Sequence, residues 1–279
     1  MSDDDVYLSP EEQLGEDAPG EGEEGDDLDK VRVIAIQAFP LNKETIIEGL
    51  SLLCQTGKRL EHAFIKLDLK ERALTDIVAI SNYIHIRFLD LSNNHISDLS
   101  PLAPMTHLLW LKARNIQKVS GLQNADFGNL VILELRGNQL ETTSGFDLPN
   151  LRKLYLAQNF IKRLEGLEKL ERLTTLHLRD NQLETLEGLC SEMKCLQYLN
   201  IRGNAITEGD ALQSLRLLTN SLKSLVIAEN PVVDTILYRP SILILLPQLE
   251  RIDKEVVTLK ERTEAQRSIR ELRDEEEAP

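Results

Sequence analysis

The sequence predicts an α/β solenoid, in which short parallel strands line a concave face and irregular or 3₁₀ segments return along a convex side. Asparagine recurs about every 21 to 23 residues, or at twice that interval, with a longer last interval: Asn94, Asn138, Asn159, Asn181, Asn204 and Asn230. Leucine or isoleucine stands at fixed offsets before and after each asparagine. A unit of about 20 to 29 residues reading L-x-x-L-x-L-x-x-N-x-L is the signature of the leucine-rich repeat.

The clearest unit, residues 173–189, reads L-T-T-L-H-L-R-D-N-Q-L-E-T-L-E-G-L. Leu176 and Leu178 alternate with outward residues, as a short strand that is buried on one face requires. Asn181 follows where the chain must turn, and its short polar side chain can bond to the backbone of that turn. Leucines then recur every three residues, at Leu183, Leu186 and Leu189. This spacing favours a 3₁₀ return on the convex side.

About eight such units are predicted between residues 64 and 257. In the first, which begins at Phe64, Arg72 stands where asparagine is expected. In each unit the fourth and sixth positions of the frame are the apolar strand residues. Taken unit by unit, these pairs are Leu67 and Leu69, Leu89 and Leu91, Leu133 and Leu135, Leu154 and Leu156, Leu176 and Leu178, Leu199 and Ile201, and Leu225 and Ile227. The unit of Leu108 and Leu111 is irregular over Ala113–Ile116, where asparagine comes about two positions early. The period from Asn94 still predicts a turn near Ile116.

A solenoid needs caps, because an end repeat would otherwise expose an apolar face to water. Lys43–Leu60, within the segment 41–63, carries apolar residues at helical spacing and predicts an amphipathic capping helix. Ile242–Ile252 ends the apolar pattern and predicts the C-terminal cap. Residues 258–279 are rich in strong helix formers and predict a charged helix and tail. That helix either packs only its first turns on the last repeat or acquires a partner in an assembly.

Residues 1–40 are predicted to be an acidic, disordered tail. Thirteen acidic side chains and no lysine or arginine occur in residues 1–29, so this stretch carries nearly all of the net charge of -14. The tail is either simply solvated or an arm that docks on a basic partner. No basic stripe remains to neutralise phosphates, which excludes nucleic acid as a partner.

No membrane association is expected. The apolar run Val31–Phe39 is too short to span a bilayer and lies too far into the chain to be a signal peptide. The three cysteines, Cys54, Cys190 and Cys195, do not form the bridged caps of extracellular repeat proteins. We therefore expect a soluble protein of the cytoplasm.

The sequence contains no catalytic constellation, and we expect no enzymatic activity and no cofactor. The five histidines are scattered, and none has a metal-ligand spacing to Cys190 or Cys195. The recurrent glycines belong to convex turns that read x-G-L, so no loop is available to cradle a phosphate. Function must then reside in a binding surface.

The repeat frame predicts which residues face outward on the concave side, because alternate strand residues point to opposite faces. Ten of these outward residues are predicted to bind a partner: Phe88, Trp110, Lys112, Arg114, Arg136, Tyr155, His177, Arg179, Tyr198 and Arg202. Aromatic and arginine side chains dominate protein interfaces. Two alternatives remain: Phe88 and Trp110 pad the edge of the core, or the arginine row is a solvated face balanced by Glu134 and Asp90.

Several stretches resemble the family of leucine-rich repeat-containing protein 23. They are H-A-F-I-K-L-D-L-K-E-R-A-L-T-D-I (62–77), T-H-L-L-W-L-K-A (106–113), L-E-L-R-G-N-Q-L-E (133–141), T-T-L-H-L-R-D-N-Q (174–182) and L-Q-Y-L-N-I-R-G-N (196–204). The match includes outward residues such as Trp110, Arg136 and His177, which generic repeats would not share. The family carries more repeats between residues 113 and 133, so the resemblance implies that this chain is shortened at its irregular unit.

The resemblance implies a structural subunit of the radial spoke in the axoneme of motile cilia and sperm flagella, at the third spoke and its head. It also implies a role in motility, a location in the cytoskeleton, and a monomeric subunit whose partners are other radial spoke proteins. One alternative is a regulatory subunit of protein phosphatase 1, whose repeat is of the same type. Another is a tubulin- or dynein-associated repeat protein of the axoneme.

Overall fold

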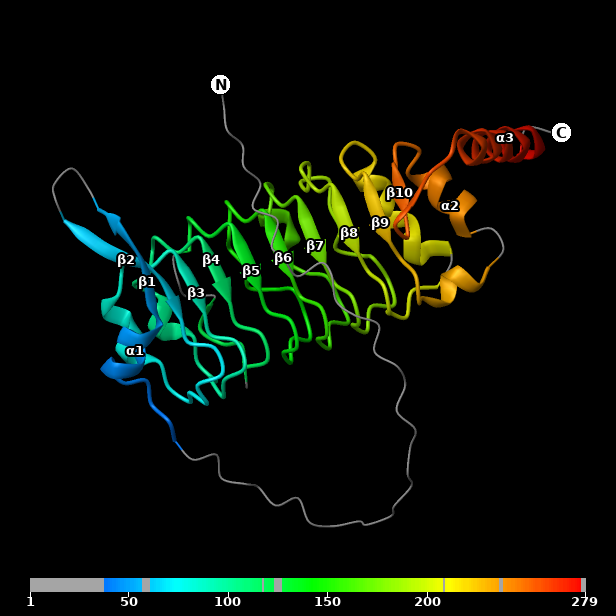
Figure 1. Ribbon diagram of the computed structural model, residues 1–279. Coiled ribbons are helices and arrows are strands. Elements are labelled where there is room, and N and C mark those ends of the chain that lie inside the picture. Colours follow the sequence, from blue (N-terminus) through cyan, green and yellow to red (C-terminus); the bar gives the residue numbers. More distant parts are fainter. Residues whose placement is uncertain are drawn as a thin grey trace, which may run out of the picture. The chain divides into compact units, whose positions relative to one another are not determined.

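The computed structural model describes residues 38–56, 61–116, 118–122, 127–207, 209–235 and 238–276, which belong to one compact unit beginning at Ala38. Its strands form a single sheet in chain order, β1 to β11. Figure 1 shows β1 to β10 side by side along the solenoid. The middle strands are parallel, and an antiparallel strand flanks them at each end. The predicted α/β leucine-rich repeat solenoid is confirmed.

The strands that form the concave face are short and evenly spaced along the chain. The parallel strands are β2 (His62–Asp68), β3 (Phe88–Asp90), β4 (Trp110–Lys112), β5 (Ile132–Glu134), β6 (Lys153–Tyr155), β7 (Thr175–His177), β8 (Tyr198–Asn200), β9 (Ser224–Val226) and β10 (Arg251–Ile252). β1 (Leu50–Gln55) pairs with β2, and β11 (Glu255–Val256) pairs with β10. The middle leucine of each repeat strand pairs in register with the next, as Leu89, Leu111 and Leu133 do, and these leucines are buried in a continuous core.

The convex side consists of 3₁₀ segments and irregular turns. The 3₁₀ segments are Val78–Asn82, Ser100–Leu102, Leu167–Lys169, Gly209–Leu218 and Pro231–Asp234. In the unit 173–189 the expected 3₁₀ return is reduced to a turn, with a hydrogen bond from the Leu189 amide to the Leu186 carbonyl. The predicted convex side of 3₁₀ and irregular segments is therefore confirmed, although the 3₁₀ return expected for this unit is an irregular turn.

The recurrent asparagines form a buried ladder that connects successive coils. Asn181 accepts from the amide of Ile161 at 3.0 Å, and its amide group donates to the carbonyls of Leu156 and Leu178, each at 3.0 Å. Asn159, Asn204 and Asn230 repeat this arrangement. Each side chain thereby satisfies backbone groups of two coils that are out of reach of water, which explains why asparagine recurs.

The irregular unit keeps the geometry of the coil but has no asparagine at the ladder position. Ile116, buried at 5% exposure, takes the ladder position, and Asn115 lies one position before it rather than two, with φ 50°. The Asn115 amide group donates to Asn93 Oδ1 at 2.8 Å, so an exposed bond between side chains connects these coils. The next coil has Gly137 at the equivalent place, where a Cβ would lie 1.8 Å from Asn115 Oδ1.

The N-terminal cap differs from the prediction of one helix over 41–63. Helix α1 (Lys43–Gly49) begins at Asn42, whose side chain accepts from the Thr45 amide at 2.8 Å, and it ends at Gly49. A Cβ at Gly49 would lie 2.3 Å from the Asp68 carbonyl oxygen. The next residues do not continue the helix but form strand β1, which pairs with β2. The backbone hydrogen bonds of this pairing outweigh the helical pattern of the sequence. Phe64 is also 42% exposed, and Ile65 is buried in its place.

The C-terminal cap comprises helix α2 (Tyr238–Leu245), strands β10 and β11, and helix α3 (Leu259–Glu276). Thr258 and Glu261 cap α3 reciprocally, and Arg239 of α2 pairs with Glu261 at 2.7 Å. Ala265 is buried, which confirms that the first turns of α3 pack on the domain. Of the predicted acidic tail, residues 1–37 lie outside the described part of the chain. Residues 277–279 lie outside it as well.

Candidate partner-binding surface

The outward residues of the concave face form three columns across the strands. Strand pairing sets the first two columns, and amide-to-carbonyl bonds that continue past the strands set the third. The first column runs Phe88, Trp110, Ile132, Lys153, Thr175 and Tyr198; the second runs Asp90, Lys112, Glu134, Tyr155, His177 and Asn200; the third runs Ser92, Arg114, Arg136, Ala157, Arg179 and Arg202. Neighbouring strands lie about 4.8 Å apart, so residues within a column can touch. All ten predicted residues occupy these columns.

Glu134 organises the N-terminal part of this surface. Its Oε1 accepts from Trp110 Nε1 at 2.9 Å, its Oε2 pairs with Arg114, and its side chain is only 6% exposed. Lys112 Nζ lies 4.6 Å from the centroid of the Trp110 ring. Trp110 is therefore a half-buried side chain held by a carboxylate, rather than simple padding of the core. The sequence predicts Glu134 only as a counter-charge to the arginines.

Three rings stack across β6, β7 and β8. The centroids of Tyr155 and His177 are 4.7 Å apart, and those of His177 and Tyr198 are 4.9 Å apart. Burial, reinforced by the charge of Lys153, lowers the pKa of His177 to about 4, so the ring is neutral at pH 7. The stack is a rigid, uncharged platform. Its residues were predicted individually, but the stacking depends on the register of three strands.

The arginine row has the predicted register but is interrupted by Ala157 into two pairs. Arg136 Nε donates to Gln158 Oε1 at 3.0 Å, Arg179 pairs with Asp180 at 3.1 Å, and Arg202 pairs with Glu229. The bond with Glu229 raises the pKa of Arg202, and the bond with Arg202 lowers the pKa of Glu229.

Of the two counter-charges expected for the arginines, one is correct. Glu134 pairs with Arg114, whereas Asp90 accepts from the Ser92 amide at 3.0 Å. The other two acids, Asp180 and Glu229, follow the strands at positive φ, and the repeat frame gave no signal for them. Three of the four guanidinium groups in the row are therefore held by acidic side chains. The Arg179 side chain remains 46% exposed and that of Arg202 remains 32% exposed, so both can still meet a partner.

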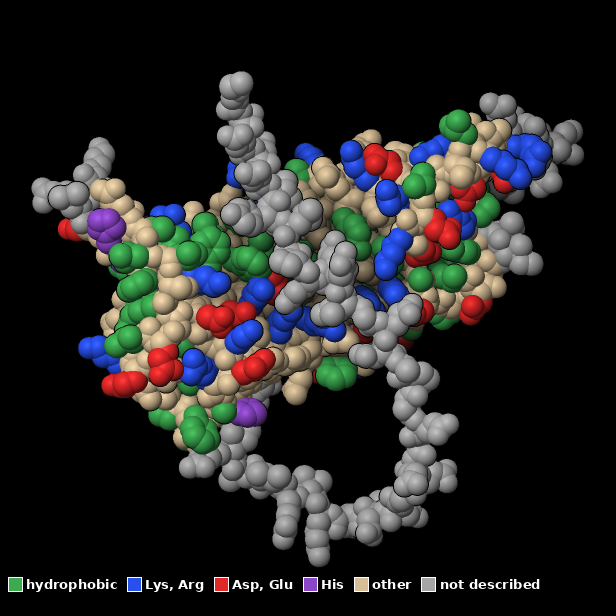
Figure 2. Space-filling view, in the orientation of Figure 1, with side chains coloured by type: hydrophobic (Ala, Val, Ile, Leu, Met, Phe, Trp, Pro, Cys, Tyr) green, Lys and Arg blue, Asp and Glu red, His purple; other side chains and the backbone are tan. Residues whose placement is uncertain are grey.

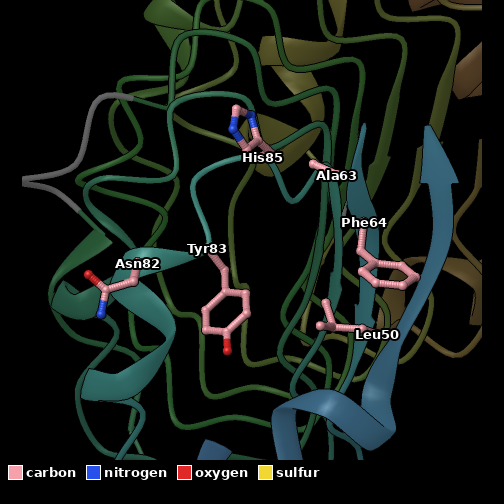
Figure 3. Close-up of a pocket in the computed structure, with 6 residues that line it drawn as sticks. All are labelled: Leu50, Ala63, Phe64, Asn82, Tyr83 and His85. Carbon is pink, nitrogen blue, oxygen red and sulfur yellow. The ribbon is translucent and has the colours of Figure 1, made fainter. Parts of the chain in front are cut away.

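The remaining surface offers little for chemistry. Within the described part of the chain, no cluster of three metal-ligating side chains occurs, and no helix is long and apolar enough to cross a membrane. A hollow of about 150 Å³ lies at the N-terminal end, lined by Leu50, Ala63, Phe64, Asn82, Tyr83 and His85 (Figure 3). The lining contains no acidic side chain, lysine or arginine.

Comparisons with known proteins agree with this architecture. The family model described as Leucine-rich repeat matches residues 132–278, and a second model described as Leucine Rich Repeat matches residues 85–106. The chain is a leucine-rich repeat protein, a class that serves protein interaction. It is 42% identical to human leucine-rich repeat-containing protein 23 over 282 residues, covering 85% of this chain and 82% of the relative. The mouse protein of that name is 42% identical, with 99% and 95% covered. The chain belongs to the leucine-rich repeat-containing protein 23 family.

More distant similarities, one in sequence and one in fold, extend beyond this family. Human U2 small nuclear ribonucleoprotein A' is 33% identical over 141 residues, which covers 50% of this chain and 55% of that protein. An internalin from Listeria monocytogenes has a TM-score of 0.53 at 23% identity, covering 64% of this chain and 51% of its own.

The family relatives are longer than this chain within the matched region. The alignment with the human relative extends over 282 residues but covers 85% of a 279-residue chain, so about 45 positions lack a counterpart here. That length corresponds to two repeats. The missing length agrees with the prediction that this chain is shortened. Strands β4 and β5, on either side of the irregular turn, nevertheless pair in unbroken register.

Proposed function

We propose that this chain is a non-enzymatic structural subunit of the radial spoke in motile cilia and sperm flagella, at the third spoke and its head. In this role it binds other radial spoke proteins in the axoneme and supports motility. The membership of the leucine-rich repeat-containing protein 23 family supports the assignment, together with the resemblance at outward residues.

The observation that carries the binding role is the content of the concave columns. Trp110 is fixed by Glu134, three rings form a rigid platform, and arginines are held in one register. Side chains that are already ordered lose little entropy when a partner binds, and aromatic and arginine residues contribute most to interfaces. We therefore place the partner across β4–β8.

A pull-down from ciliary extract tests this placement. The double variant Trp110→Ala with Arg179→Glu removes one anchor and reverses the charge of another. We expect recovery of radial spoke proteins to fall at least about tenfold, which corresponds to 1.4 kcal/mol. Thermal unfolding followed by circular dichroism confirms that the variant is folded.

The matched control is Phe160→Ala with Lys162→Glu, which makes the same kinds of change at two exposed residues outside the three columns. It should leave recovery unchanged. Equal recovery with both double variants would contradict the concave surface as the binding site. Recovery of a protein phosphatase 1 catalytic subunit in place of spoke proteins would favour the phosphatase alternative.

A further inference from the structure

The concave face of β4–β8 is basic, although the chain as a whole is acidic. Residues 1–29 carry thirteen of the acidic side chains, so the rest of the chain is close to neutral. Figure 2 shows Lys and Arg side chains gathered in the middle of the solenoid, between its two ends. Across these five strands the three columns contain one acid, Glu134, and six cations: Lys112, Arg114, Arg136, Lys153, Arg179 and Arg202. Positive charge is therefore concentrated on this face.

Acidic side chains of the chain itself balance only half of these cations. Three of them, all arginines, each pair with one acidic side chain. Within the described part of the chain, the other three, Lys112, Arg136 and Lys153, form no ion pair with a carboxylate. Lys112 instead lies over the Trp110 ring, and Arg136 donates to the neutral Gln158. The face therefore keeps an excess of positive charge that the carboxylates of a partner can match.

An apolar row adjoins these charges. Phe88, Trp110 and Ile132 are successive residues of the first column, paired in register across β3, β4 and β5, and each is half-buried. Trp110 is also held in place by Glu134. Apolar side chains of a partner that covered this row would remove its remaining surface from water. A partner that fits the whole face therefore needs both carboxylates and apolar side chains.

The ring stack disfavours a nucleic acid on the same face. Bases bind protein by stacking on open aromatic rings. Here Tyr155 and Tyr198 cover the two faces of His177, at centroid distances of 4.7 and 4.9 Å. Half of the cations are also engaged by carboxylates, which leaves few for a phosphate backbone. The arrangement suits a segment of protein better.

We propose that the concave face of β4–β8 binds an acidic segment of a partner protein that also carries apolar side chains. Its carboxylates pair with Lys112, Arg136 and Lys153. Its apolar side chains lie on the row that contains Trp110 and Ile132. The proposal rests on the proposed use of this face for binding and adds the chemistry of the partner. Such complementarity also discriminates against basic segments, because like charges on the two sides would repel each other.

The test is a selection from a library of random peptides displayed on phage, with the purified full-length chain as the bait. The enriched peptides should be acidic and should contain aliphatic or aromatic residues. Each enriched peptide is then synthesised with a fluorescent label, and its dissociation constant is measured from the anisotropy. Binding of the unlabelled peptide should also shift the emission of Trp110, which is the only tryptophan.

Two charge-matched variants locate the contact. Arg136→Glu with Lys153→Glu replaces two attractions by repulsions and should raise the dissociation constant at least about tenfold. The control, Lys162→Glu with Lys194→Glu, makes the same change at two exposed residues outside the columns and should leave binding unchanged. Arg136→Gln with Lys153→Gln removes the charges without adding repulsion. It should weaken binding to a smaller extent, and it serves as the test if the reversed variant does not fold.

Four results would overturn the proposal. They are enrichment of neutral or basic peptides, no enrichment at all, acidic peptides that bind the Arg136→Gln, Lys153→Gln variant as tightly as the wild-type chain, and binding of polyuridylate that the same variant abolishes. Peptides that bind only after the thirteen acids of residues 1–29 are changed to Asn or Gln would show that the chain's own acids fill the face, and would overturn it as well. The selection uses no ciliary protein, so its outcome is separate from that of the spoke assignment.

Discussion

Two coils of the solenoid, one containing Leu176 and the other containing Leu111, have the same core and differ in the bonds that connect them to their neighbours. Both leucines are fully buried in register-matched strands. In the first coil Asn181 joins the ladder, whereas in the second Ile116 fills that place and Asn115 forms a bond at the surface. The comparison indicates that the leucine frame maintains the coil, and that the asparagine strengthens it without being required in every repeat.

The largest effect is expected from the shared core. Leu176→Ala and Leu111→Ala should each lower the free energy of unfolding by about 2 to 5 kcal/mol, because each leaves a cavity in a packed interior. Leu199→Ala should behave in the same way. Chemical denaturation measures these values. Near-wild-type stability for any of the three would contradict the leucine frame.

The two coils should differ in how much stability they lose when the hydrogen bonds to their neighbours are removed. Asn181→Ala removes the partners of three buried backbone groups and should cost about 2 to 4 kcal/mol. Asn115→Gly removes an exposed bond and still suits the positive φ at this position, so it should cost no more than about 0.5 to 1 kcal/mol. Denaturation of the two variants side by side makes this comparison. Equal costs would show that the ladder is no stronger than the surface bond.

Acid should destabilise the protein through His177, which belongs to the first coil. Its folded pKa of about 4 lies below the ordinary value of 6.5, so the unfolded chain binds the proton more tightly. The stability contributed by the neutral ring is present above pH 6.5 and is lost as the pH falls toward 4. We expect about 2 to 3 kcal/mol over this window. His177→Gln should abolish this part of the pH dependence between pH 6.5 and 4, and an unchanged profile would exclude the histidine as its source.

A more local effect is expected beside the second coil, at the side chain of Glu134. Glu134→Gln preserves the shape of the side chain but removes the charge that faces Arg114, and it should cost about 1 to 2 kcal/mol. The tryptophan fluorescence should also shift, since Trp110 is the only tryptophan and donates to Glu134. No shift and no loss of stability would show that Glu134 does not hold Trp110.

The core was predictable from the sequence because one frame repeats, so Leu176 and Leu199 could be placed from spacing alone. The ten concave residues could be placed for the same reason. Their contacts could not, because the pairing of Glu134 with Trp110 and the ring stack depend on which strands become neighbours. The cap helix was overestimated because Leu50–Gln55 fits a helical pattern locally, whereas pairing with β2 is a long-range contact.

We propose that the concave surface is what places this chain in the radial spoke. The most direct test expresses the fluorescently tagged chain, and separately its Trp110→Ala, Arg179→Glu variant, in multiciliated cells that lack their own copy. We expect the wild-type chain to localise along the axoneme with radial spoke proteins and the variant to stay in the cytoplasm. Exclusion of the wild-type chain from motile cilia, or normal localisation of the variant, would contradict it.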